Sequence, residues 1–246
     1  MTQSARDWEN TFAHAWTLLV RNPVIVIPCL ATGVIAAGVQ FFVGVVVMGS
    51  VAVSGDGSRG ALEAIETLTE IVLFVITLAL SLMQMAYVTG MAGAAWRHGR
   101  TSLRDGWAAL GHRMWPLLAA AALLLVIGIC AATLASVTFL VTLLAYAVFF
   151  IYTMAAVVIG ERPPIAAIIQ SANIALANFL PTLGIVLLIA VIALLGGWLG
   201  SLAGRVSDIG GWLVAGLLQQ IIVAYASLVV AGEYLALASP PPQAGS

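Results

Sequence analysis

Long uncharged runs dominate the chain, and each is of a length that can cross a lipid bilayer. About 20 helical residues span a hydrocarbon core about 30 Å thick. The run 116–160 is about twice that length, so we interpret it as two helices joined by a turn. We place that turn at 132–138, where Thr133, Ser136 and Thr138 cluster. The pattern predicts six transmembrane helices, from the runs 24–48, 71–95, 116–160, 182–204 and 212–237.

Three shorter segments precede pairs of these runs and have an amphipathic pattern. They cover residues 6–22, 97–116 and 165–180, and they end near Pro23, Pro116 and Pro181. A narrow apolar face on a short helix predicts that it lies in the headgroup plane. The apolar faces of the first two segments contain Trp8, Phe12, Trp16 and Leu19, and Leu103, Trp107, Leu110 and Met114.

The order of these segments repeats three times. Aligning Phe12 with Leu103 and Ile168 superimposes Trp16 on Trp107 and brings the three prolines to within two residues of one another. We therefore predict an all-α integral membrane protein: six transmembrane helices as three hairpins, each preceded by a short amphipathic interfacial helix. The single membrane domain 1–246 would comprise the repeats 1–96, 97–160 and 161–237, followed by a disordered tail, 238–246.

Composition supports this class and excludes others. The chain is 62% hydrophobic and 8% charged, with a mean hydropathy of +1.11, whereas a soluble domain carries about 25% charged residues. The net charge of −1 argues against binding to nucleic acid, which requires a basic surface. The start of the chain has no short apolar core with a cleavage site, so we expect no signal peptide.

The charges are distributed unequally between the two sides of the predicted bundle. All nine basic residues are Arg. With both termini in the cytoplasm, only Arg59 and Arg205 face outward, which agrees with the positive-inside rule. Trp8, Trp16 and Trp107 would anchor the inner interface. The segment 97–116 is either such an anchor or a docking helix for a soluble partner. The inward-facing set is Arg6, Arg21, Arg97, Arg100, Arg104, Arg113 and Arg162.

No pattern of catalytic or metal-binding residues is present in the sequence. His14, His98 and His112 fall at the predicted cytoplasmic surface, and Cys29 and Cys130 lie in apolar runs, where they resemble small hydrophobic residues. No run carries a charged residue or His near its middle, which argues against proton relays. We therefore expect no enzyme activity, no cofactor and no metal. The lipid bilayer is the expected partner, and a homo-oligomer or a membrane-protein partner is left open.

Small and amide residues within the runs predict contacts between helices. Gly196, Gly200 and Gly204 recur every four residues, which suits close packing inside the monomer or at a dimer face. Gln84 and Gln219 lie at similar depths, so we predict that Gln84 pairs with Gln219 or with its neighbour Gln220. Gln40 is the competing partner, and a polar path lined by these amides is the alternative.

Two stretches carry a resemblance to a known family. FAHAWTLLVRNPVIVIP (12–28) and ERPPIAAIIQSANIALANFLPTL (161–183), with the six-span layout, resemble the membrane domain of bacterial glycerophosphodiester phosphodiesterases and related uncharacterised six-span bacterial membrane proteins. The catalytic barrel of those enzymes has no counterpart here. The resemblance implies a bacterial cytoplasmic-membrane protein linked to lipid or envelope metabolism. The alternatives are a permease subunit of an ATPase-driven exporter and a structural or assembly subunit of a larger membrane complex.

Overall fold

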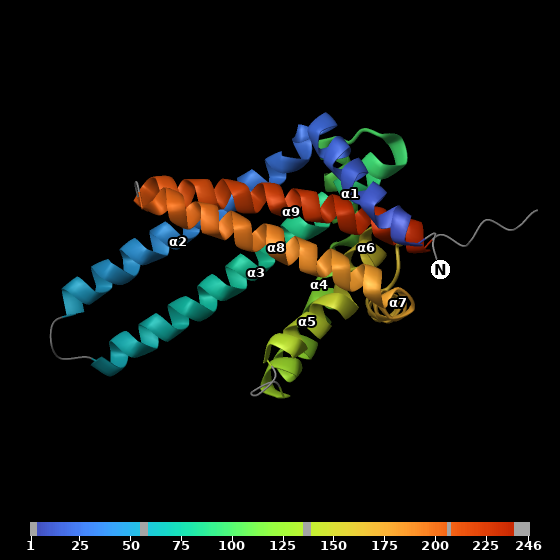
Figure 1. The fold of residues 1–246 in the computed structure, drawn as a ribbon. Helices are drawn as coiled ribbons and strands as arrows, with labels where there is room; N and C mark the ends of the chain where they lie inside the picture. The colour runs from blue at the N-terminus through green and yellow to red at the C-terminus, as the bar shows by residue number, and fades with distance from the viewer. Residues whose placement is uncertain (1–3, 55–58, 135–138, 206–207, 239–246) are drawn as a thin grey trace, which may run out of the picture.

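A computed structural model describes residues 4–54, 59–134, 139–205 and 208–238, and these residues form helices without any strand (Figure 1). A short 3-10 helix, η1 (Pro23–Ile25), follows the first helix. The α-helices are α1 (Ser4–Arg21), α2 (Val26–Ser54), α3 (Arg59–His98), α4 (Leu103–Leu134), α5 (Phe139–Phe150), α6 (Thr153–Val158), α7 (Pro164–Ala177), α8 (Phe179–Gly204) and α9 (Asp208–Ala238).

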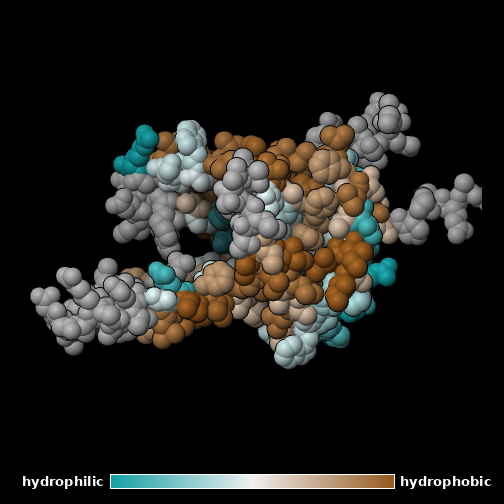
Figure 2. Space-filling view, turned by 90° about the horizontal axis from the view of Figure 1, so that it is seen from below, coloured by the Kyte–Doolittle hydropathy of each residue, from teal (hydrophilic) through white to brown (hydrophobic). Residues whose placement is uncertain are grey.

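Six segments of the described chain are long and apolar enough to cross a membrane, which confirms the predicted number. Many of their large apolar side chains are exposed, and Figure 2 shows hydrophobic residues across the middle of one face. An aqueous surface would not tolerate so much apolar area, whereas lipid tails cover it without cost. The spans are Pro23–Val43, Thr67–His98, Leu103–Ala131, Val141–Val158, Phe179–Leu202 and Val214–Ala238.

The spans converge at one end of the bundle and spread apart toward the other (Figure 1). The convergent end carries α1 and α7 and holds most of the core, which includes Ile25, Met91, Tyr152, Ile185 and Leu228, all fully buried. We call it the charged end, because the segments that join there carry Arg21, Arg97, Arg113 and Arg162. The opposite ends of α2 and α3 expose apolar side chains to the surroundings.

The predicted break at Pro116 is wrong, because α4 continues through it without interruption. The proline costs one helical hydrogen bond, but the residues on either side share one buried face: Leu110, Leu117 and Ala121. Continuing the helix keeps that face packed. The middle segment, 97–116, is therefore no separate interfacial helix; its helical part is the first turns of the third span.

Asparagine marks the breaks in the first and third repeats. Asn22 has φ −126° and ψ 63°, and Asn178 has nearly the same conformation, with φ −128° and ψ 47°. In each, the backbone N–H and the side-chain amide both donate to the carbonyl four residues earlier. Arg113 occupies the aligned position in α4. An Arg side chain does not compete with the helical backbone in this way, so the helix runs on there.

Other boundaries also differ from the sequence prediction. The helices α2 and α3 extend into the segment 50–60, whose Gly, Ser and Asp content predicts a loop. Pro181 lies in the first turn of α8, where its missing N–H has no helical partner to lose. The fourth span is broken between α5 and α6, which the sequence did not predict. Part of the predicted turn at 132–138 lies outside the described residues. Almost all of the predicted tail, 238–246, lies outside them too.

The glycine series of α8 packs inside the monomer. A Cβ atom added at Gly200 would overlap the Cβ of Ala215 in α9, and one at Gly196 would meet Ile222 Cδ1 at 2.7 Å. A Cβ atom added at Gly197 would have no atom from another described helix within 4 Å. Two members of the predicted series thus allow α8 and α9 to approach closely, and Gly204 is the last residue of α8.

We predict that Gly200→Leu destabilises the protein by about 1–3 kcal/mol, because a larger side chain forces α8 away from α9. Gly197→Leu is the matched control on the same helix and should change stability by less than about 0.5 kcal/mol. Thermal unfolding in mild detergent measures both. Equal melting temperatures for the two variants would contradict the proposed close contact.

Candidate functional site

A hydrogen-bonded chain of polar side chains joins three spans at membrane depth. Gln84 of α3 donates from Nε2 to Gln220 Oε1 of α9 at 2.8 Å, and its own Oε1 accepts from Thr32 Oγ1 of α2 at 2.7 Å. Gly33 makes room for this contact, since an added Cβ would lie 2.9 Å from Gln220 Nε2. This confirms the predicted pairing of Gln84 with Gln220, while Gln219 is exposed. The side chain of Gln40 lies outside those that the structure describes.

A second set of polar contacts ties the segments together at the charged end. The Asn22 side chain donates to Gly99 O at 3.3 Å and accepts from Thr101 N at 3.1 Å, which joins α1 to the α3–α4 connection. Arg97 donates to Ile159 O at 3.2 Å. Arg113 forms a salt bridge with Glu161. These contacts connect elements of all three predicted repeats.

The predicted anchor residues lie mostly on the surface of this end. Arg100 and Arg104 are exposed, as are Trp16 and Trp107. Trp16 contacts the ring of Tyr225, and Trp107 contacts that of Tyr87. Asp105, near the start of α4, accepts from the backbone N–H and the hydroxyl of Ser102, which is half of a capping box. The side chain of Trp8 is not among those described.

A serine from another helix forms hydrogen bonds with the backbone at the break in the fourth span. Ser171 Oγ, in α7, donates to Phe149 O at 2.8 Å and accepts from Tyr152 N at 3.2 Å. The Tyr152 hydroxyl lies 3.3 Å from Thr182 Oγ1 of α8. Thr153, the first residue of α6, is 0% exposed, and its hydroxyl has no hydrogen-bond partner among the described residues. Broken spans with buried polar groups are the places where many membrane proteins bind ligands.

Glu233 is the one acidic residue in the predicted sixth run, and the structure buries it. It is 6% exposed and lies near the end of α9. Its carboxylate is close enough to the Tyr152 hydroxyl to interact with it electrostatically. Burial of a carboxylate requires partners inside the protein, so Glu233 belongs to the packed charged end and not to its surface.

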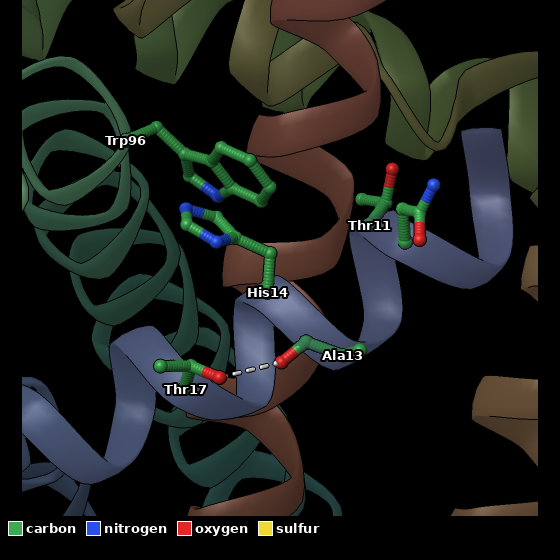
Figure 3. A pocket seen from close by; sticks show the side chains of 6 residues that line it. Thr11, Ala13, His14, Thr17 and Trp96 are labelled. Atoms are coloured by element: carbon green, nitrogen blue, oxygen red, sulfur yellow. Dashed lines mark hydrogen bonds between the residues drawn. The ribbon is translucent and has the colours of Figure 1, made fainter.

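The described residues line grooves at the charged end, two of which contain polar side chains. One lies beside α1, where the ring of His14 packs on that of Trp96 with centroids 4.8 Å apart (Figure 3). Thr17, on the same groove, uses its hydroxyl to bond Ala13 O. The other runs along α7, with Arg162 at one end and Asn178 at the other. Within the described residues, no three His, Cys, Asp or Glu side chains are grouped to hold a metal ion.

No family model matches the chain, and no curated protein or solved structure matches it either. The resemblance to the phosphodiesterase membrane domain therefore has no support beyond the quoted sequence stretches.

Sequence reasoning missed Asn22, Ser171 and Tyr152 as structural residues. Asn22 directly precedes a Pro at the end of an amphipathic segment, and this pattern indicates a turn, so the sequence did contain a signal for its role. Ser171 gave no comparable signal, because its role depends on a span that is distant in sequence.

We predict that Gln84→Leu destabilises the protein by about 1–2 kcal/mol, because it leaves the Gln220 amide and the Thr32 hydroxyl without this partner in an apolar medium. The control is Gln219→Leu, which changes the same residue type at the neighbouring, exposed position of α9 and should cost less than about 0.5 kcal/mol. Unfolding in mixed detergent micelles measures both. If Gln219→Leu lowers stability more than Gln84→Leu does, the polar contact contributes little to stability.

Proposed function

We propose that this chain is a non-enzymatic, multi-pass protein of the bacterial cytoplasmic membrane, built from three repeats of a surface segment followed by a helical hairpin. Its role would be linked to lipid or envelope metabolism, as the sequence resemblance implies. The surface segments of the first and third repeats are α1 and α7, and that of the second is the start of α4.

One observation carries this proposal: the polar side chains at the charged end connect the repeats to one another. Asn22 bonds residues 99 and 101, which joins the first repeat to the second, and Arg113 forms a salt bridge with Glu161, which joins the second to the third. The Trp96 indole N–H donates to Leu228 O at 2.8 Å, which joins the first repeat to the third. Groups committed to such contacts hold a scaffold together, whereas catalysis needs groups that converge on a substrate.

The positive-inside rule supports a cytoplasmic position for the charged end. The C-terminal ends of α3 and α9 lie there, while the C-terminal ends of α2 and α8 lie at the opposite end (Figure 1). Seven of the nine Arg residues belong to segments assigned to the inner side. Orientation follows the Lys and Arg content of short loops, so both termini would be cytoplasmic.

We predict the following topology from reporter fusions. Fusions after Gly57 and Ser207 should report an outer location, and fusions after Gly99 and Arg162 an inner one. The difference in Arg content between the two sides is the physical reason. An inner signal at Gly57 would overturn the topology.

The non-enzymatic role predicts that the His residues are dispensable. A strain lacking the gene should show altered phospholipid composition or reduced resistance to detergents. A variant with His14, His98 and His112 all changed to Gln should restore the normal state, since in the described part of the chain the three are not grouped as ligands of one metal ion. Gly200→Leu, which disrupts packing, serves as the failing control. If the triple variant folds and reaches the membrane but does not restore the normal phospholipid composition and detergent resistance, the result would indicate acid–base chemistry. If the strain lacking the gene has normal phospholipid composition and normal resistance to detergents, the link to lipid or envelope metabolism is contradicted.

A permease subunit is the second candidate, and the broken fourth span favours it. A discontinuous helix beside the buried Thr153 and Tyr152 is typical of transport sites. The exposed start of α4 would then dock the ATPase. Purification of the chain from its native membrane in mild detergent distinguishes the candidates. A soluble ATPase recovered in stoichiometric amount supports the permease, whereas another membrane protein in fixed ratio supports a subunit of a larger complex.

A further inference from the structure

The groove along α7 has a composition that suits one kind of ligand. It has a volume of about 480 Å³ and combines the polar side chains of Arg162, Gln170 and Asn173 with the apolar side chains of Ile169 and Leu237. Leu237 belongs to α9, so the groove lies where a helix at the bundle's end meets a membrane span. In Figure 1, α7 is seen nearly end-on while α8 and α9 run across the view, so α7 lies crosswise to these spans.

The helix α7 has three distinct faces. Ala167, Ser171 and Ile174 are buried against the bundle. Ile165, Ile169 and Leu176 form an apolar ridge, with 65%, 54% and 62% of each residue exposed. Gln170 and Asn173 lie between these two faces at helical spacing. Because α7 lies at the end of the spans, the ridge can enter the acyl region while the polar strip stays at the depth of the lipid headgroups.

The groove carries a positive charge that the described residues do not neutralise. The side chain of Arg162 is exposed and forms no salt bridge with any residue in the described ranges. The neighbouring acid, Glu161, is already paired with Arg113. Arg97 lies near enough for both guanidinium groups to act on the Tyr234 hydroxyl. An anion in the groove would therefore meet a favourable potential.

The amide groups add hydrogen-bond donors beside this charge. Gln170 Oε1 accepts from the Tyr234 hydroxyl, so the amide N–H groups of Gln170 remain able to donate. The Asn173 side chain is exposed on the same strip. An Arg with neighbouring amide donors is a suitable arrangement for phosphate oxygens.

We propose that the α7 groove binds the headgroup of an anionic phospholipid from the inner leaflet. Arg162 pairs with the phosphate, Gln170 and Asn173 donate to headgroup oxygens, and an acyl chain lies on the ridge formed by Ile165, Ile169 and Leu176. The ridge favours a lipid over a soluble phosphate, because only a ligand with an apolar tail covers both surfaces. The proposal rests on the proposed function for the placement of the charged end in the inner leaflet.

The test uses the full chain in neutral detergent at 0.15 M ionic strength, titrated with dioleoyl phosphatidylglycerol and followed by native mass spectrometry. Arg162→Gln should weaken binding by about tenfold, since it removes a charge-assisted hydrogen bond to the phosphate. Arg100→Gln removes the same charge from the same end but outside the groove. It should change the affinity by less than about twofold, because salt screens distant charges.

Two further titrations identify the ligand. Dioleoyl phosphatidylcholine, which has the same tails and no net charge, should bind at least about tenfold more weakly than the anionic lipid. Glycerol phosphate, the headgroup chemistry without tails, should not compete at equal concentration. Competition by glycerol phosphate would show a soluble-anion site, and equal binding of the two lipids would show that charge has no role.

An equal loss of affinity in the Arg162 and Arg100 variants would overturn the assignment of the groove. Melting temperatures of both variants show whether either substitution alters the fold. The reporter fusion after Arg162 separates this proposal from the proposed function. If that fusion reports an inner location and the lipid titrations fail, only the lipid site is wrong.

Discussion

The interior of a bilayer offers no hydrogen bonds, and this constraint accounts for where the polar groups of the chain lie. Backbone groups can be satisfied within helices, but each side-chain amide or hydroxyl needs a partner from the protein. Gln84 finds one on each of two other spans. Most of the remaining side-chain contacts between segments lie at the charged end, where the helices also pack most tightly. The helices are therefore tightly packed at the charged end, whereas at the opposite end they expose apolar side chains that suit contact with lipid.

The same constraint explains which features could be predicted from the sequence. Uncharged apolar runs of spanning length form helices in a membrane, and the run 116–160 is long enough for two, so the number of spans follows from composition and length. The pairing of Gln84 with Gln220 follows from depth, since an amide at that level must meet another polar group. Neither inference requires knowledge of the tertiary structure beyond the direction of the spans.

The features that could not be predicted depend on competition between local and tertiary effects. Pro116 carries the strongest helix-breaking signal of the second repeat, yet the buried face from Leu110 to Ala121 outweighs it. Asn22 and Asn178 end helices because their side chains share the carbonyls of the last turn. The break at Tyr152 has no local cause at all, because the run 139–159 contains no Gly, Pro, Asn or Asp that would signal a helix break. It exists because Ser171 satisfies the two backbone groups that the break frees.

That break is also where the scaffold and permease hypotheses make different physical demands. In a scaffold, Ser171 keeps its two hydrogen bonds and the junction of α5 and α6 stays fixed. In a permease, α6 must move relative to α5, and each backbone group released from Ser171 costs about 1–3 kcal/mol unless water reaches it. The polar groups of Tyr152, Thr153 and Thr182 lie at this junction. Transport through the fourth span therefore requires a hydrated junction, whereas a scaffold keeps it dry.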